Sequence, residues 1–462
     1  MSIQPLRPLP AVLLMVLWCG YAASRAADRP NVVFLLADDQ RADTISALGN
    51  PYIRTPNLDQ LVRRGFAFTR AYCMGSQVQA VCMPSRAMML TGRGLFGAMR
   101  ASDDWGRISV AYAMWPEVLR AAGYKTIGIG KWHNDRASYT RAFSAGGPVF
   151  FGAMGDHSHL PVYDYNANGN YGSTNRHMTA RHSSELFANA AVAHIRASKG
   201  KPFAMYVAFT APHDPRAAPA AYMKSYLPAA LPLPENFMPE HPFDNGDMNV
   251  RGEQLLPRPR KPGAIKRELA AYYAMISHLD TQIGGIFKAL RDIGAGQNTI
   301  VIYAADNGLA LGSHGLLGKG SLYEHSMRVP LIIAGPGVPA GSSAALCYLY
   351  DVYPTLCELV GVSPPGTVQG KSLLPIVRGE QQSVRDSIFC AYRDVQRMVS
   401  NDRWKLIYYP KIGRLQLFDL ANDPNETSDL IMDGGLNEQV IKMIDELGIG
   451  QWQAGDPLIQ PF

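Results

Sequence analysis

Four apolar runs, each ending in polar residues, are the most regular feature of the chain. They occupy residues 31–40, 124–133, 203–213 and 299–308. Each run suits a buried parallel strand, and stretches with helical periodicity lie between them. The clearest helix is predicted over residues 267–290, where apolar residues recur at intervals of three and four. This alternation predicts an α/β fold, with a large and mostly parallel sheet between two layers of helices.

Two later segments depart from this pattern. Residues 212–262 contain 11 of the 33 prolines, which predicts a long ordered loop near a functional site. Residues 397–420 alternate between apolar and polar positions and turn at Gly413, as antiparallel strands do. A helix is predicted over residues 437–447. We therefore expect a main domain over residues 28–374 and a small α+β subdomain with an antiparallel sheet over residues 375–462.

The polar ends of the four predicted strands are candidates for a shared site. Ligands of open α/β sheets bind beyond the carboxyl ends of the strands. The residues at these ends are Asp38, Asp39, Lys131, His133, His213, Asp306 and Asn307. A single charged residue after a strand is usually a solvated loop residue, whereas four such ends together indicate one site.

The first 27 residues have the pattern of a cleaved signal peptide. Arg7 precedes an apolar stretch over residues 11–23, and small residues surround Ser24 and Ala26. We therefore expect an exported protein, periplasmic or secreted. A lipoprotein anchor at Cys19 is the alternative, although Trp18 fits that processing site poorly. No other segment is apolar enough to span a membrane, so we expect no further membrane contact.

Charge and cysteine content narrow the function classes. The chain of 462 residues has a formal charge of +6 and no dense run of Lys or Arg, which argues against a nucleic-acid partner. The five cysteines after the predicted signal peptide show neither a CxxC pair nor zinc spacing. The sequence leaves their disulfide pairing open.

Asp38, Asp39, Asp306 and Asn307 offer carboxylate and amide oxygens, the ligands that Ca²⁺ and Mg²⁺ prefer. Capping and turn formation are the alternative roles for such residues. A basic set accompanies them, formed by Arg86, Lys131, His133, His213 and Lys319. A cation with this many donors makes an anion pocket, so we expect a substrate with a tetrahedral oxyanion.

Cys82 precedes Pro84, which suits the first turn of a helix, so its side chain is expected at the positive end of that helix. A thiolate nucleophile is conceivable there. Thiol chemistry does not explain a hard cation beside it, since sulfur prefers softer metals.

Residues 82–93 read CMPSRAMMLTGR, which resembles the type I sulfatase signature C-x-P-S-R-x-x-x-L-T-G-R at every position. Further similarity lies in FLLADDQ, GKWH, PHDP, ADNG, GLLGKGSLYEHSMRVPLI and LFDLANDPNETSDL. The resemblance implies the alkaline phosphatase-like fold. It is strongest to the iduronate-sulfatase side of the family, and His325 and Ser326 stand where many arylsulfatases have two glycines.

The resemblance also implies a mechanism. In that family the cysteine is oxidised to formylglycine by a formylglycine-generating enzyme, so Cys82 would become the nucleophile as an aldehyde hydrate. Its oxygen and the residues Asp38, Asp39, Asp306 and Asn307 would hold Ca²⁺. Arg86, Lys131 and His133 would bind the modified residue, with His133 as the base that regenerates the aldehyde. His213 and Lys319 would face the sulfate and the leaving oxygen.

The departure at His325 and Ser326, together with export, favours a sulfated carbohydrate as substrate. Candidate sugar contacts are Asn134, Asp135, His157, His159, Asp214, Arg216 and His314. One alternative is a hydrolase of the same superfamily that acts on a sulfamate, a phosphonate ester or a small sulfate such as choline sulfate. Another is a non-catalytic glycan-binding protein, which would have no use for the modification motif.

Overall fold

The computed structural model describes residues 29–98 and 106–458. The predicted signal peptide lies outside these residues. Among the helices within the described ranges, none combines the length and the apolar character needed to cross a membrane.

The main sheet has eleven strands in the order β11-β2-β10-β9-β1-β8-β4-β5-β6-β7, with β12 also paired to β2. Its strands in chain order are β1 (Asn31–Ala37), β2 (Phe66–Tyr72), β4 (Lys125–Lys131), β5 (Ala145–Phe150), β6 (Pro161–Tyr163), β7 (Arg176–Met178), β8 (Phe203–Ala208), β9 (Thr299–Ala305), β10 (Arg328–Ala334), β11 (Gly341–Ser343) and β12 (Cys347–Tyr348). The predicted mostly parallel sheet is confirmed.

The four strands predicted from the sequence, β9, β1, β8 and β4, are consecutive neighbours at the centre of this sheet. All three pairings between them are parallel. Both faces of β1 and β9 are fully buried, which explains their unbroken apolar sequences. Because the strands run in the same direction, their carboxyl ends meet at one edge of the sheet.

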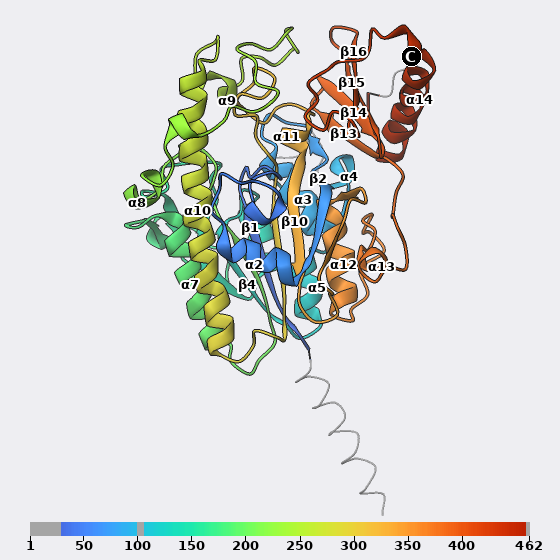
Figure 1. The fold of residues 1–462 in the computed structure, drawn as a ribbon. Helices are drawn as coiled ribbons and strands as arrows, with labels where there is room; N and C mark the ends of the chain where they lie inside the picture. The colour runs from blue at the N-terminus through green and yellow to red at the C-terminus, as the bar shows by residue number, and fades with distance from the viewer. Residues whose placement is uncertain (1–28, 99–105, 459–462) are drawn as a thin grey trace, which may run out of the picture.

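Helices cover both faces of the sheet (Figure 1). One layer contains α2 (Pro56–Arg64), α7 (Ser183–Ala197) and α10 (Pro262–Asp292). The opposite layer contains α3 (Cys82–Thr91), α5 (Trp115–Ala121) and α12 (Val352–Leu359). Helix α10 extends beyond both ends of its predicted range and buries an apolar stripe that includes Leu279, Ile283 and Ile286.

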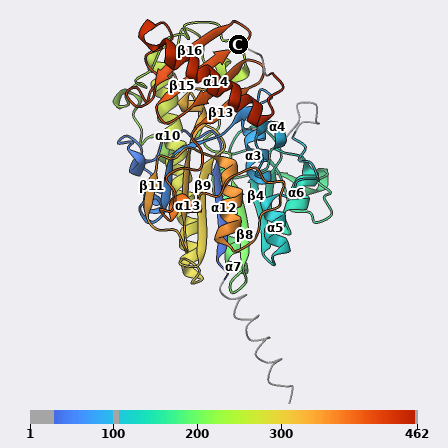
Figure 2. The same cartoon turned by 90° about the vertical axis from the view of Figure 1, so that its right-hand side faces the viewer.

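A second sheet of five strands has the order β16-β15-β14-β13-β3. Its strands are β3 (Gly75–Ser76), β13 (Ile388–Tyr392), β14 (Gln396–Ser400), β15 (Trp404–Tyr409) and β16 (Arg414–Asp419). Helix α14 (Asn437–Ala454) packs on this sheet (Figure 2). The predicted antiparallel strands are therefore present, and the terminal helix is longer than predicted. The sequence did not indicate that β3, from the first hundred residues, pairs in parallel with β13.

The proline-rich segment after β8 contains only three short helical turns, α8 (Ala220–Met223), η3 (Pro228–Ala230) and α9 (Arg251–Gln254). Backbone hydrogen bonds tie it to the loop after β9. The His314 amide donates to the Asn236 carbonyl at 2.7 Å, and the Met238 amide donates to the Gly312 carbonyl at 3.4 Å. The segment is thus an ordered covering over the carboxyl edge of the sheet.

A buried ion-pair network joins the two sheets. Lys405 on β15 lies 2.7 Å from a Glu426 oxygen and 3.1 Å from a Glu324 oxygen, and Glu324 begins α11 (Glu324–Met327). The Lys405 side chain is fully buried. Removing its charge would leave the buried Glu426 carboxylate without its cation, and Glu324 with only Arg328 at 3.4 Å.

We predict that Lys405→Met lowers the free energy of unfolding by about 3–5 kcal/mol, because breaking a buried pair leaves uncompensated charge. Urea denaturation measures this change. Lys411→Met is the matched control, because Lys411 pairs with Asp394 at the surface and its loss should cost only ~0–1 kcal/mol. Adding Glu426→Gln to Lys405→Met should restore part of the stability, and equal losses for both lysines would contradict the network.

Candidate active site

Four polar residues meet at the carboxyl edge of the central strands. Asp38 and Asp39 follow β1, Asp306 and Asn307 follow β9, and all four are buried. The Asp39 amide donates to Asp306 Oδ1 at 3.0 Å, and Asn307 Nδ2 donates to Asp39 Oδ1 at 2.9 Å. The parallel pairing of β1 with β9 brings the two sequence motifs together.

Three cations face these carboxylates. Arg86 Nε donates to Asp306 Oδ2 at 2.9 Å, and Lys131 pairs with Asp38. Lys319 Nζ lies 2.6 Å from Asp39 Oδ1 and 3.2 Å from Cys82 Sγ. The predicted acidic and basic sets therefore form one cluster.

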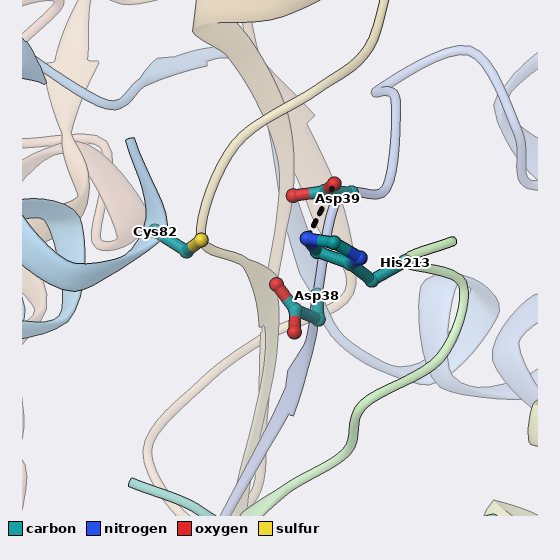
Figure 3. Close-up of side chains that lie close together, drawn as sticks. All are labelled: Asp38, Asp39, Cys82 and His213. Carbon is teal, nitrogen blue, oxygen red and sulfur yellow. Dashed lines mark ion pairs between the residues drawn. The ribbon is translucent and has the colours of Figure 1, made fainter. Parts of the chain in front are cut away.

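Cys82 is the first residue of α3 and is 1% exposed. Ser85 Oγ donates to the Asp306 carbonyl at 2.6 Å, so the first turn of α3 is tied directly to the end of β9. Figure 3 shows Cys82 directed from α3 toward Asp38, Asp39 and His213. Burial raises the pKa of the Cys82 thiol despite the nearby charges of Lys319 and Lys131, so the site does not favour a thiolate.

The backbone around the cluster has unusual conformations. Asp39 and His133 have positive φ angles of 67° and 64°, which few non-glycine residues adopt. Gly130 has a φ of 88°, and a Cβ there would lie 2.0 Å from the Ala208 carbonyl oxygen. Glycine at this position therefore lets β4 pack against β8 and deliver Lys131 to the cluster.

Two oxygen atoms in the cluster have no hydrogen-bond donor from the protein. Asp38 Oδ1 and Asn307 Oδ1 are buried and accept no hydrogen bond. Burial, and next the charge of Asp38, raise the pKa of Asp306 to about 6. A divalent cation among these oxygens would satisfy the two unpartnered atoms. The donor set therefore fits a hard metal ion such as Ca²⁺.

His213 also lies within reach of this position. One ligand atom from each of Asp38, Asp39, Cys82 and His213 can be chosen so that all lie within 4.8 Å of one another. His213 Nε2 is 3.6 Å from Asp39 Oδ2 (Figure 3). Burial lowers the pKa of His213 to about 4 against the opposing effect of Asp39, so its imidazole is neutral at pH 7. The oxygen donors remain the better match to a hard ion.

A cavity of about 190 Å³ opens above the cluster. Its wall contains five of the predicted catalytic and metal-binding residues, Asp39, Cys82, His133, His213 and Lys319. Asp38, Arg86, Lys131, Asp306 and Asn307 lie behind them, fully or almost fully buried. The arrangement can hold a metal ion and present several N–H donors to an anionic group in the cavity.

The model of the family described as Sulfatase matches residues 30–362. The chain belongs to the sulfatase family. A second model, described as N-sulphoglucosamine sulphohydrolase, C-terminal, matches residues 312–451 of this sulfatase. Its function as a sulfatase enzyme follows from this membership together with the relatives named next.

Two curated relatives span most of the chain. An N-acetylglucosamine-6-O-sulfatase from Bacteroides thetaiotaomicron is 25% identical, covering 91% of this chain and 86% of its own. An arylsulfatase from Clostridium perfringens is 27% identical, covering 89% and 92%. Both match the sulfatase over nearly its whole length.

Solved structures share the fold. A sulfatase YidJ structure from Bacteroides fragilis has a TM-score of 0.78 at 23% identity, covering 94% of this chain and 97% of its own. BT4656 in complex with D-glucosamine-2-N,6-O-disulfate has a TM-score of 0.77 at 22% identity, covering 93% and 99%. A phosphonate monoester hydrolase from Agrobacterium radiobacter has a TM-score of 0.73 at 22% identity, covering 92% and 96%. The predicted alkaline phosphatase-like fold is confirmed.

Of the predicted sugar contacts, Asp214 and Arg216 line the cavity. Asp135, His157 and His314 are not among the wall residues, and each has partners inside the protein, so their sugar contacts stay predictions. Asp135 Oδ1 caps α6 (Arg136–Ala142) by accepting from the Ser138 amide at 2.8 Å. His157 bonds to Thr210 Oγ1 at 3.0 Å and the His213 carbonyl at 2.9 Å.

His314 stacks on Tyr323 with ring centroids 3.9 Å apart and bonds to the Glu426 carbonyl at 2.8 Å. These contacts order the loop after β9. Asn134 is buried with both side-chain polar atoms unpartnered, and neither it nor His159 is part of the cavity wall. Their sugar contacts likewise stay predictions.

Several wall residues were not predicted from the sequence. Arg251 and Leu255 come from the proline-rich segment, Met154 follows β5, and Tyr392 ends β13 of the second sheet. The proline content placed the segment near the site but did not select residues within it. No sequence signal linked Tyr392 to the cavity, because its position depends on the pairing of β13 with β3.

Proposed function

We propose that this sulfatase hydrolyses sulfate esters of a carbohydrate, with Cys82 converted to formylglycine and Ca²⁺ held by Asp38, Asp39, Asp306 and Asn307. The position of Cys82 carries the proposal. Its Sγ lies 3.2 Å from Lys319 Nζ, at the start of α3 and at the floor of the cavity. A plain thiol with a raised pKa has no evident task among hard oxygen ligands.

The hydrated aldehyde supplies one hydroxyl as a nucleophile and a second hydroxyl whose proton loss allows release of sulfate. The Cys82 side chain marks where that group would lie. A Ca²⁺ ion in the cluster would add positive charge beside it. Asp38 Oδ1 and Asn307 Oδ1, which are otherwise unpartnered, are the oxygens most in need of that ion.

The surrounding side chains orient the nucleophile and neutralise charge. Lys319 Nζ stands between Cys82 and Asp39, so it can donate a hydrogen bond to the modified residue or to a sulfate oxygen. Arg86 and Lys131 fix the carboxylates of Asp306 and Asp38 from behind. These preorganised charges need little rearrangement when charge spreads over the sulfate oxygens.

Proton transfer would fall to the groups that reach the cavity wall. Lys319 is the proton donor we assign to the departing alcohol oxygen, and His133 is the base we assign to the return of the aldehyde. His213 is neutral and its Nδ1–H donates to the Asp214 carbonyl at 2.8 Å, so it would have to gain a proton before it could share the first role. Burial, and next the charge of Lys131, lower the pKa of His133 well below its usual range, so it is neutral. Its Nδ1 is buried without a partner, which leaves that atom free for this role.

The substrate class is supported by the relatives and by the wall. One relative is named an N-acetylglucosamine-6-O-sulfatase, and one structure contains a glucosamine disulfate. A choline ester would require an aromatic cage for its ammonium group. The only Phe, Trp or Tyr that the described residues contribute to the wall is Tyr392. We further propose export through residues 1–27, to the periplasm or the medium, and maturation by a formylglycine-generating enzyme.

Mass spectrometry of the tryptic peptide 71–86 tests the nucleophile. In protein from its native host we predict an aldehyde at Cys82, with oxygen in place of sulfur, whereas Cys73 in the same peptide remains a thiol. Cys82→Ala should bind substrate without turnover. An unmodified Cys82 in active native protein would rule the mechanism out.

Asp306→Asn tests the metal assignment. We predict that calcium binds at least ~10-fold more weakly, because the site loses one ligand charge. We also predict that turnover falls by ~100-fold or more. Elemental analysis of the purified protein measures calcium independently of activity. Asp280→Asn is the matched control, since Asp280 is also buried with a raised pKa but accepts from Asn57 and Leu58 beside α2. Equal calcium content in both variants would show that calcium does not bind at this site.

A substrate panel tests the carbohydrate assignment. We predict that kcat/KM for a sulfated amino sugar exceeds that for an aryl sulfate, choline sulfate and a phosphonate monoester by ~10-fold or more, because only the sugar fills the wall beyond the cluster. Preference for the phosphonate ester would favour the alternative superfamily activity. Binding of sulfated sugars without turnover of any ester by fully modified protein would favour the non-catalytic alternative.

A further inference from the structure

The cavity wall beyond the catalytic cluster contains few charges. The described residues contribute three charged side chains there, Asp214, Arg216 and Arg251, and the rest is apolar, backbone or the amide of Gln79. These three side chains therefore decide which charged substituents a substrate can bring into the cavity.

Asp214 is already compensated. Its Oδ2 accepts from Arg251 Nη2 at 2.6 Å, and its Oδ1 lies 3.5 Å from His213 Nδ1. Burial would raise the pKa of Asp214, but Arg251 and His213 lower it below the usual value, so the carboxylate stays ionised and paired. It therefore contributes little net charge to the wall.

Arg216 differs because one edge of its guanidinium is free. Its side chain is 4% exposed, and Nη1 donates to Glu268 on α10. Nε and Nη2 are buried and have no hydrogen-bond partner. These two nitrogens form one edge of the planar guanidinium, whose parallel N–H groups match two oxygens of a carboxylate or a sulfate.

A buried arginine with an unused two-donor edge is costly unless a ligand completes it. Glu268 does not line the cavity, so it neutralises the charge of Arg216 from behind without occupying that edge. The wall of the same cavity also contains Leu255, Leu317 and Tyr392, which suit the apolar face of a sugar ring. One cavity therefore offers both a donor for a second anion and an apolar surface for the sugar.

We propose that Arg216 binds a second anionic group of the substrate through its Nε and Nη2 donors, so that this sulfatase selects saccharides carrying another sulfate or a carboxylate besides the scissile sulfate. This inference rests on the carbohydrate assignment above. Arg216 is a specificity-determining residue here, and the catalytic cluster acts without it.

Selectivity between matched substrates tests the proposal. The probes are glucosamine 6-sulfate, glucosamine 2-N,6-O-disulfate, and a monosulfated disaccharide with and without a uronic carboxylate. We expect the wild-type protein to prefer one dianionic probe over its monoanionic match by at least ~10-fold in kcat/KM. Which pair shows the preference distinguishes a second sulfate from a carboxylate. A wild-type ratio near one for both pairs would overturn the proposal.

Variants of Arg216 then test whether this residue causes the preference for a dianionic probe. Arg216→Gln should reduce the selectivity ratio toward one, mainly through KM, and Arg216→Lys should restore only part of it because lysine keeps the charge but not the two-donor edge. Glu268→Gln is the matched control and should keep the selectivity ratio within about threefold of the wild-type ratio. This substitution removes the ion pair with Arg216 but leaves the Nε and Nη2 donors of Arg216 free. Equal losses on both probes for Arg216→Gln would show a merely structural role.

Measurements of substrate binding test this inference independently of the proposed hydrolytic activity. Titration calorimetry of the disulfate and monosulfate probes with Cys82→Ala protein, with and without Arg216→Gln, requires no turnover. Tighter binding of the disulfate that depends on Arg216 supports the proposal even if no ester is hydrolysed. Equal affinities in a wild-type enzyme that does hydrolyse sugar sulfates would overturn it and leave the sulfatase assignment intact. If Arg216→Gln does not fold, the wild-type ratio and Arg216→Lys still decide.

Discussion

Buried charge at the carboxyl edge of the main sheet is the constraint on which the structure depends. Three carboxylates, Asp38, Asp39 and Asp306, lie almost fully out of water, and each needs a compensating cation. Lys131, Lys319 and Arg86 supply these charges. The two unpartnered oxygens of Asp38 and Asn307 remain unsatisfied by any protein donor. The cluster is therefore nearly neutral as protein alone, and a divalent cation would make it positive enough to attract a sulfate group.

The second sheet also helps to build this site. Strand β3 pairs with β13 only a few residues before Cys82, so the segment that enters α3 is held by the C-terminal part of the chain. Tyr392 at the end of β13 lines the cavity, and its hydroxyl lies 3.0 Å from Asp247 Oδ2 in the proline-rich segment. The C-terminal sheet is therefore part of the cavity wall rather than a separate appendage.

The sequence predicted the parts of the site that follow from local rules. Buried parallel strands are apolar throughout and end in polar residues, so Asp38, Asp39, Asp306 and Asn307 could be placed at one edge before the fold was known. Pro84 likewise placed Cys82 at a helix start. The positions of His157 and His314 could not be predicted in this way, because a histidine with internal partners and one in a cavity wall have the same local pattern. The same holds for Arg251 and Tyr392, which reach the wall only through long-range packing.

The difference between the predictable cluster and the unpredictable outer wall has a physical reason. Most residues of the cluster stand at the ends of β1, β4 and β9 or on α3, where register and burial leave little freedom of position. His213 and Lys319 lie in the loops after β8 and β9. Residues of the outer wall stand on the segment after β8, on the short helix α9 and at the end of β13. Surface segments of that kind accept substitutions without disturbing the sheet. Two relatives with different names, an arylsulfatase and an N-acetylglucosamine-6-O-sulfatase, are 27% and 25% identical to this chain over most of its length. Its choice among sulfated compounds then depends on side chains such as Arg216, whose free donors lie outside that cluster.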